Sequence, residues 1–244
     1  MIRIDLHIHS SLSACGADEM SPYFIIREAL KRRLGLISIT DHNAIRHSLL
    51  ACEISKDRKN IKVLPGVEVT SREEVHILAY FGETSALVKL GEIIENLLPA
   101  LENKPEFFGH QVLYDSANEI VGLDYRLRQS AIDMSLDKLV EEIHKLKGIA
   151  IPAHIDKNKF SLISQLGFID KNADFDALEV SKYKWNKEKH KLGDTLSGFP
   201  LVCGSDSHTP DDIGLFFMEN RSSDFSDFHF LKKFLQERKN ENYC

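Results

Sequence analysis

The sequence predicts a single α/β domain, residues 1–244, that forms a TIM-like barrel rather than an open sheet. The chain has 244 residues, a length at which α/β barrels commonly form one domain. Short apolar segments alternate along it with segments of helical periodicity, which is typical of a largely parallel sheet. We expect roughly seven strands, and this number favours closure into a barrel.

The composition is that of an ordinary globular protein. Hydrophobic residues make up 43% and charged residues 28%, which excludes a disordered or collagen-like chain. Lys and Arg number 31 against 37 Asp and Glu, a net charge of −6, so we expect no extended nucleic-acid surface and no membrane partner. The four cysteines lie far apart without a CxxC pair, which predicts reduced thiols and a cytoplasmic location.

In the first half of the chain, Ser21 and Pro22 mark the start of a helix that ends near Gly35, because serine caps helices and proline is tolerated at their first position. Further helices are expected at 45–55 and 86–98. Apolar runs predict strands at 2–8, 36–40, 62–69 with a break at Pro65-Gly66, and 75–81.

In the second half, a helix is expected at 136–146, capped by Ser135 and stopped by Gly148. A last helix is expected at 227–238. The expected strands are 149–152, 177–180 and 201–203.

The segment 99–133 interrupts this alternation and is predicted to be an insertion. Two apolar stretches flank the turn-like residues 115–118, which predicts a β-hairpin. It is either a surface excursion or a cover over the functional site, since long loops at the carboxyl end of barrel strands often shape substrate pockets.

Histidine and carboxylate side chains recur at or beside the ends of the predicted strands. Because the carboxyl ends of the strands form the active-site face of α/β folds, we expect these side chains to converge. His7 and His9 are two apart on a strand, so they point to the same side. The eight residues of this set are His7, His9, His42, Glu68, His76, His154, Asp206 and His208.

Together these eight residues predict a metal cluster. Any one of the histidines alone is more simply a core or surface residue, but burying all of them together without metal would be costly. Imidazole and carboxylate ligands suit zinc, manganese or iron. Eight ligands are too many for one tetrahedral ion, so two or three ions are expected, ~3.5–4 Å apart where a carboxylate bridges them. Glu68 is the natural bridge.

At these positions the sequence resembles the PHP (polymerase and histidinol phosphatase) family. The motifs occur in the family's order and extend over most of the chain. The resemblance implies a distorted (β/α)7 barrel, a trinuclear metal site and phosphoesterase chemistry. The matching motifs are DLHIHS at 5–10, TDHN at 40–43, GVEVT at 66–70, HILAY at 76–80, PAH at 152–154 and SDSH at 205–208.

The resemblance also implies which residues would hold each ion. The first ion would take His7, His9, Glu68 and Asp206. The second would share Glu68 and add His76 and His154. The third would use His42 and His208 together with an acidic residue from the loop after the first motif.

That loop departs from the family's pattern. Typical members have Ser-Asp-Gly there, whereas this chain has Ser13-Ala14-Cys15-Gly16-Ala17-Asp18-Glu19. Cys15 stands about where the aspartate is expected, and a thiolate is a good zinc ligand. Asp18 or Glu19 is the alternative ligand.

The resemblance suggests that the chain hydrolyses a phosphate ester of a small metabolite or nucleotide, with a metal-bound hydroxide as the nucleophile. Glu68, Asp206 and Asp41 are the expected catalytic carboxylates. Asp41 would orient an imidazole or, alternatively, cap a helix. Lys182 and Arg128 are expected to bind the substrate, or else to be solvated surface charges.

Two other functions stay open. One is a metal-dependent amide or C–N hydrolase on a similar barrel, and the other is a non-catalytic regulatory module. His110, in the insertion, could reach the site as a proton donor. The remaining histidines fall in predicted helices and are expected at the surface: His47, His144, His190 and His229.

Overall fold

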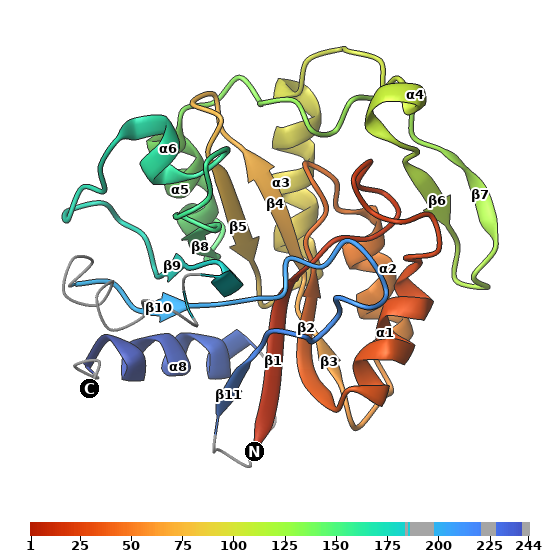
Figure 1. Ribbon diagram of the computed structural model, residues 1–244, viewed down its shortest axis with the longest axis horizontal. Coiled ribbons are helices and arrows are strands. Elements are labelled where there is room, and N and C mark those ends of the chain that lie inside the picture. The colour runs from red at the N-terminus through yellow and green to blue at the C-terminus, as the bar shows by residue number, and fades with distance from the viewer. Residues whose placement is uncertain (184, 186–197, 221–227, 241–244) are drawn as a thin grey trace.

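The computed structural model describes residues 1–183, 185, 198–220 and 228–240, so the expected surface position of His190 lies outside the described residues. Most strands lie in the middle of the molecule with helices around them, and a two-stranded hairpin lies at one edge (Figure 1). The α/β class predicted from the alternating segments is confirmed.

The first sheet has the strand order β11-β1-β2-β3. β1 (Ile2–Ile8), β2 (Leu34–Ile39) and β3 (Lys62–Val63) run parallel, and β11 (Met218–Asn220) pairs antiparallel with β1. β1 and β2 are buried along almost their whole length, as expected for strands covered on both faces. β11 was not predicted, since its three residues carry no apolar run.

The second sheet corrects the expectation of a largely parallel sheet. It contains β4 (Gly66–Thr70), β5 (His76–Tyr80) and β8 (Ile149–Pro152), and β5 runs antiparallel to both neighbours. The connection from β4 to β5 is too short for the crossover that parallel neighbours require. As a result, His76 at the start of β5 lies opposite Thr70 at the end of β4.

β9 (Leu178–Glu179) and β10 (Leu201–Val202) form a parallel pair, which completes the central strands. Isolated bridges join Ile8 to Ser207 and His42 to Glu68 across the gaps between sheets. In the described part of the chain the strands nevertheless form separate sheets, so a closed (β/α)7 barrel is not confirmed.

The long helices match the sequence periodicity within a few residues. α1 begins after Ser21, whose hydroxyl accepts a hydrogen bond from the Phe24 amide. No described helix is long and apolar enough to cross a bilayer. The two short helices α4 and α6 were not predicted. The helices are α1 (Pro22–Lys31), α2 (Arg46–Ser55), α3 (Thr84–Leu97), α4 (Pro105–Phe108), α5 (Leu136–Lys145), α6 (Leu162–Leu166) and α8 (Phe228–Asn240).

Segment 99–133 contains α4 and the hairpin expected there, formed by β6 (Val112–Tyr114) and β7 (Ile120–Leu123). β6 is hydrogen bonded to the loop after β1, since the Val112 amide donates to the Ser11 carbonyl over 2.7 Å. Gly109 has φ +98°, and a Cβ at this position would lie 2.1 Å from the Ala14 carbonyl oxygen. Only glycine therefore fits this close approach. The single-domain organisation stays a prediction.

A buried hydrogen bond ties β5 to β1 through the interior. The Tyr80 hydroxyl, on a side chain 1% exposed, donates to the Leu6 carbonyl over 2.9 Å. Leu6 directly precedes His7, so this bond helps to hold the end of β1 in place.

Tyr80→Phe should lower the free energy of unfolding by about 1–3 kcal/mol, because it leaves the buried Leu6 carbonyl without its donor. Urea denaturation followed by circular dichroism measures the change. The matched control is Tyr125→Phe, at a side chain that is 60% exposed, and it should stay within about 0.5 kcal/mol of the parent. Equal effects of the two substitutions would contradict the role given to the Tyr80 hydroxyl.

Candidate metal centre

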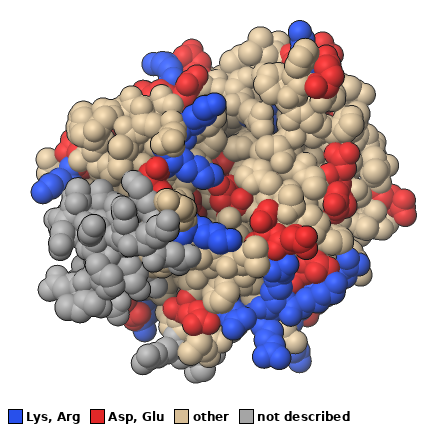
Figure 2. Space-filling view, in the orientation of Figure 1, with Lys and Arg blue, Asp and Glu red and all other residues tan. Residues whose placement is uncertain are grey.

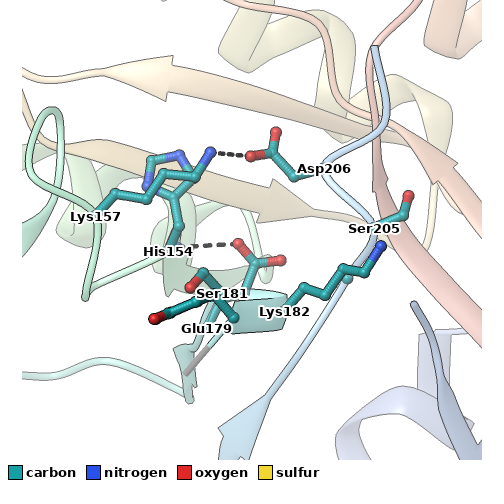
Figure 3. A pocket seen from close by; sticks show the side chains of 9 residues that line it. His154, Lys157, Glu179, Ser181, Lys182, Ser205 and Asp206 are labelled. Carbon is teal, nitrogen blue, oxygen red and sulfur yellow. Dashed lines mark hydrogen bonds and ion pairs between the residues drawn. The ribbon is translucent and has the colours of Figure 1, made fainter. Parts of the chain in front are cut away.

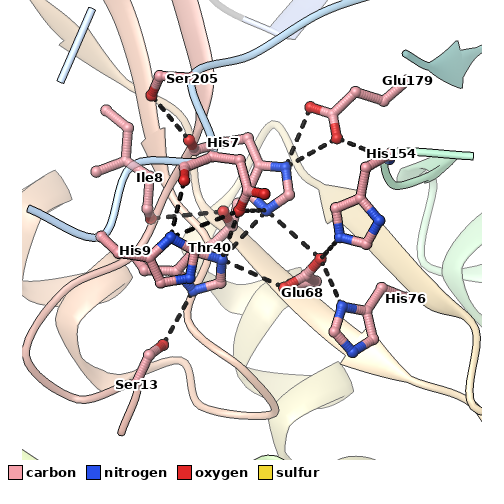
Figure 4. Close-up of polar contacts among 12 residues, drawn as sticks. His7, Ile8, His9, Ser13, Thr40, Glu68, His76, His154, Glu179 and Ser205 are labelled. Carbon is pink, nitrogen blue, oxygen red and sulfur yellow. Dashed lines mark hydrogen bonds and ion pairs between the residues drawn. The ribbon is translucent and has the colours of Figure 1, made fainter. Parts of the chain in front are cut away.

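A single carboxylate, that of Glu68, lies at the centre of the predicted cluster. Glu68 is 0% exposed, and the imidazole rings are directed toward it (Figure 4). Five histidine nitrogens lie within 3.4 Å of its two oxygens: His42 Nδ1 at 2.9 Å, His76 Nδ1 at 3.0 Å, and His7 Nε2, His9 Nε2 and His154 Nε2 at 3.4 Å. The structure thus brings together side chains that lie far apart in the sequence.

Asp206 adds a second carboxylate to the same cluster. It follows β10 in a loop and has φ +49°. Its Oδ1 lies 3.3 Å from His7 Nε2 and 3.4 Å from His9 Nε2, while its Oδ2 accepts a hydrogen bond from the Lys157 ammonium group. One oxygen therefore faces the imidazoles and the other faces a lysine.

The proton positions on His7 and His9 test whether the cluster suits a cation. His7 Nδ1 lies 2.9 Å from a Glu179 oxygen, so it must carry the hydrogen. His9 Nδ1 donates to the Ser13 hydroxyl, whose own hydrogen is donated to Asp41. When both rings are neutral, each directs its Nε2 lone pair toward the centre, and the two Nε2 atoms lie 3.2 Å apart. They are therefore close enough to contact the same cation.

Other buried atoms of the cluster also lack a regular hydrogen bond. His154 Nδ1 has none, and His42 Nδ1 and Glu68 Oε2 lie 2.9 Å apart without the geometry of one. An unsatisfied buried polar atom is costly, and these atoms have the chemistry of metal ligands. The residues therefore fit divalent ions of the kind that imidazole and carboxylate prefer.

The electrostatics keep the two carboxylates ionised. Burial alone would raise the pKa of Glu68, but the neighbouring His76, His7 and His42 lower it well below its usual range. Burial likewise would raise the pKa of Asp206, and His7 and His9 lower it. Anionic carboxylates are the form that binds a cation.

Cys15 lies at the solvent-exposed corner of the cluster. Ligand atoms of His9, Cys15, His42 and His208 all lie within 4.8 Å of one another. Burial raises the pKa of the Cys15 thiol, but hydrogen bonds with His208 and His42 outweigh it and lower the pKa to about 6. A thiolate is thus available at neutral pH.

Asp18, the alternative to Cys15, does not reach the cluster. Its carboxylate is 59% exposed and lies 3.3 Å from His110 Nδ1 in the insertion. Asp18 and His110 therefore meet at the rim, and the role suggested for His110 as a proton donor finds no support in this position. Glu19 is exposed as well.

Glu179, the last residue of β9, was not among the predicted site residues. Its carboxylate holds His7 Nδ1 and also accepts a hydrogen bond from the His154 amide over 3.0 Å. A carboxylate on the second nitrogen of a ligating histidine fixes the ring and its tautomer. The available signal was a lone glutamate in the otherwise apolar segment 177–180.

Asp41 contacts no imidazole directly. Its carboxylate accepts hydrogen bonds from the Ser10 amide, the Ser10 hydroxyl and the Ser13 hydroxyl at 2.5–2.7 Å. Asp41 orients the His9 ring indirectly, because it fixes the Ser13 hydroxyl that accepts a hydrogen bond from His9 Nδ1. The alternative of a helix cap is not observed, since α2 begins at Arg46 and has no side-chain cap.

Two cavities adjoin the cluster and share His154, Lys157 and Asp206. One, of about 480 Å³, contains most of the cluster; the other, of about 530 Å³, extends past Ser181, Lys182 and Tyr183. In Figure 3, Lys157 reaches Asp206 across the shared wall while Lys182 extends toward Ser205. Lys182 therefore lies where a substrate-binding cation was expected.

Arg128, the other expected cation, lies elsewhere. Its guanidinium is 11% exposed and pairs with Glu95 on α3 and with Asp124 in the insertion, so its charge is neutralised by two carboxylates that line neither cavity. The lysines that sequence reasoning missed are Lys157 and Lys159, in the loop after β8. Their signal was a basic run, Lys157-Asn158-Lys159, just beyond the His154 motif.

The helical histidines divide into two kinds. His229 is exposed and His144 is partly exposed, as expected. His47 corrects the expectation, since it is 0% exposed. Its ring lies between the Ser10 hydroxyl and the Tyr114 amide, and polar partners at both ring nitrogens are what allow a histidine to be buried.

This chain is similar in structure to endonucleases. It aligns with the lesion-specific endonuclease PfuEndoQ from Pyrococcus furiosus at 18% identity over 97% of this chain, with a TM-score of 0.71. It also aligns with an Endonuclease Q complex with a 27-mer duplex substrate that has an abasic lesion at the active site, again at 18% identity over 97% of this chain, with a TM-score of 0.69. The chain spans 56% of the length of each of these two structures.

Two further structures extend the comparison. A two-domain protein from Bacteroides vulgatus, containing a predicted PHP-like metal-dependent phosphoesterase, aligns at 17% identity over 98% of this chain and 63% of that chain, with a TM-score of 0.55. An amidohydrolase from Chromobacterium violaceum with bound sulfate aligns at 23% identity over 96% of both chains, with a TM-score of 0.61. No protein-family model and no curated sequence matches this chain.

These comparisons confirm the PHP resemblance at the level of the fold. They also overturn the prediction that the partner is a small phosphorylated molecule and that no extended nucleic-acid surface exists, since Endonuclease Q has this fold and takes a DNA duplex as its substrate. The prediction rested on the net charge of −6. Net charge averages over the whole surface, whereas phosphate contacts depend on local cations.

Glu179→Gln should weaken metal binding by about 10- to 100-fold, because it removes the carboxylate that orients His7. Competition with a chromophoric chelator measures the affinity. The control is Glu92→Gln on an exposed position of α3, which should bind metal like the parent. Unchanged affinity of the Glu179 variant would contradict the role of this carboxylate.

Cys15→Ser should reduce the number of bound ions by one relative to the parent, because a neutral hydroxyl is a poor ligand beside His42 and His208. Cys15→Asp should restore it, since it supplies the anion that the family has there. Elemental analysis of dialysed protein counts the ions. Asp18→Asn is the control and should leave the count unchanged; loss of an ion in that variant instead would assign the site to Asp18.

Proposed function

We propose that this chain is a metal-dependent phosphoesterase that hydrolyses a phosphodiester bond in nucleic acid. The observation that carries the proposal is the buried Glu68 carboxylate within 3.4 Å of five imidazole nitrogens. The lysine-lined cavities beside it give a phosphate a place to bind.

The proposed ligands are the residues that the sequence motifs indicate. Glu68 would bridge two ions, with His7, His9 and Asp206 on one side and His76 and His154 on the other. His42, His208 and Cys15 would hold a third. Zinc, manganese or iron suits this donor set, and Lewis-acid activation of water and of the phosphoryl group is the chemistry that such ions supply.

The chain's own residues would bind and orient the substrate. Lys157 already pairs with Asp206, so its ammonium group lies at the edge of the cluster, where a phosphate would contact it. Lys182 would contact the phosphate or sugar from the adjoining cavity. Glu179 and Ser13 would keep the Nε2 atoms of His7 and His9 unprotonated toward the centre.

Nucleic acid is favoured over other phosphate esters by the endonuclease comparisons and by the local cations. Lys157, Lys159 and Lys182 line the two cavities next to the cluster. Figure 2 shows Lys and Arg side chains interspersed with Asp and Glu on this face. A substrate strand would therefore be held by a few local contacts rather than by a continuous basic stripe.

Amide or C–N bond hydrolysis is the second candidate, and the similarity to an amidohydrolase favours it. The same ions would polarise a carbonyl group. A non-catalytic module is the third candidate, and a metal-loaded chain inert toward every substrate would support it.

The test is a substrate panel offered to the chain loaded with Zn²⁺, Mn²⁺ or Fe²⁺. The panel contains labelled single-stranded DNA, duplex DNA, duplex DNA with one abasic site, and a set of amides. Cleavage of a DNA strand, read on a denaturing gel, is the expected result. Hydrolysis of amides with intact DNA would establish the second candidate instead.

The double variant His7→Ala/His9→Ala should lose both bound metal and strand cleavage, because two Nε2 ligands disappear. Metal content and gel assays measure the two losses separately. His229→Ala, at an exposed position, is the control and should retain both. Cleavage by a metal-free double variant would refute the metal-dependent mechanism.

A further inference from the structure

We infer that His47 is a positioning residue that links the inserted hairpin to the proposed metal ligand His9 through an unbroken chain of buried hydrogen bonds. This inference rests on the proposed metal centre and adds a residue that neither the motifs nor the proposed ligand set contains. His47 is on α2, and its side chain touches none of the proposed ligands in the described contacts.

The first part of the chain of bonds runs from the hairpin to the loop after β1. The Tyr114 amide in β6 donates to His47 Nε2 over 3.0 Å. His47 Nδ1 lies 2.8 Å from the Ser10 hydroxyl oxygen. Ser10 directly follows His9, and both His47 and Ser10 are 0% exposed.

The second part runs from Ser10 back to the ligand. The Ser10 hydroxyl donates to Asp41 Oδ2 over 2.5 Å, and the Ser13 hydroxyl donates to Asp41 Oδ1 over 2.7 Å. Ser13 Oγ lies 3.1 Å from His9 Nδ1. Asp41 and Ser13 are also 0% exposed, so water does not compete for these bonds.

Only one arrangement of protons satisfies every member. Asp41 can only accept, so both serine hydroxyls must donate to it. Each serine oxygen then accepts from a histidine, which places the hydrogens of His47 and His9 on Nδ1. His47 must be neutral, because its Nε2 accepts from an amide; consistently, burial and the nearby Arg46 lower the pKa of His47 to about 3.

The consequence for His9 is a fixed ring and a fixed tautomer. Its Nε2 is directed at Glu68 and Asp206 because its Nδ1 is held by Ser13. His47 supports the opposite side of the same Asp41 carboxylate through Ser10. The Tyr114 amide is the hairpin's contact with these bonds, and the bond from His47 Nδ1 to Ser10 is the one that supports the ligand.

Two substitutions of His47 distinguish the contributions of its two ring nitrogens. In His47→Asn, the side-chain amide can take the place of Nδ1 and donate to Ser10, while the acceptor for Tyr114 is lost. In His47→Gln, the longer amide can take the place of Nε2 and accept from Tyr114, while the donor to Ser10 is lost. Each variant loses one hydrogen bond, so a purely structural role predicts similar effects from both.

The probe is Co²⁺, whose visible absorption reports the geometry of its ligands. We expect His47→Gln to bind Co²⁺ about 10- to 100-fold more weakly than the parent, with a shifted spectrum. His47→Asn should bind within about 2-fold and keep the parent spectrum. Urea denaturation of both variants measures their stabilities, and His144→Gln on α5 serves as a control that should leave the spectrum unchanged.

Parent-like affinity and spectrum in both variants, or an equal loss in both, would overturn the inference. A spectrum changed in the Asn variant and kept in the Gln variant would overturn it as well. A parent chain that binds no Co²⁺ would overturn the proposed metal centre itself and, with it, the role of His47. The two failures are therefore distinguishable.

Discussion

The structure depends on one constraint: a fully buried carboxylate, Glu68, must be surrounded by partners that compensate its charge. Removing an ionised carboxylate from water is costly unless it is paired. Here the compensation comes from imidazoles supplied by β1, β5 and the loops after β2 and β8. The Nε2 atoms of His7 and His9 lie 3.2 Å apart, close enough to contact the same cation. The arrangement is that of a cation-binding centre.

The surrounding fold serves to orient these rings rather than only to bring them near. Glu179 accepts a hydrogen bond from His7 Nδ1. The Ser13 hydroxyl accepts one from His9 Nδ1 and donates its own hydrogen to Asp41. The reversed direction of β5 brings His76 to the rim where β4 ends. Such supporting contacts determine which nitrogen carries the proton, and therefore which nitrogen can act as a ligand.

The sequence predicted the cluster well because its signals are local and periodic. The two-residue spacing of His7 and His9 specifies one side of a strand, whatever the topology around it. The direction of β5 was not predicted, because it depends on a connection too short for a crossover, a feature of length rather than of hydrophobic pattern. Glu179 and Lys157 were missed, since each is a single charged residue whose importance arises only from a partner far along the chain. Arg128 was misplaced for the same reason, since Glu95 and Asp124 neutralise it.

The unequal burial of the cluster has a kinetic consequence. His7, His9, His76, His154 and Glu68 are nearly inaccessible, whereas Cys15 is exposed and the His208 side chain is 31% exposed. An ion bound at that corner would exchange with free ions in solution faster than ions bound at the buried positions. The centre would then combine slow-exchanging inner positions with one labile outer position, whose occupancy follows the metal supply around the molecule.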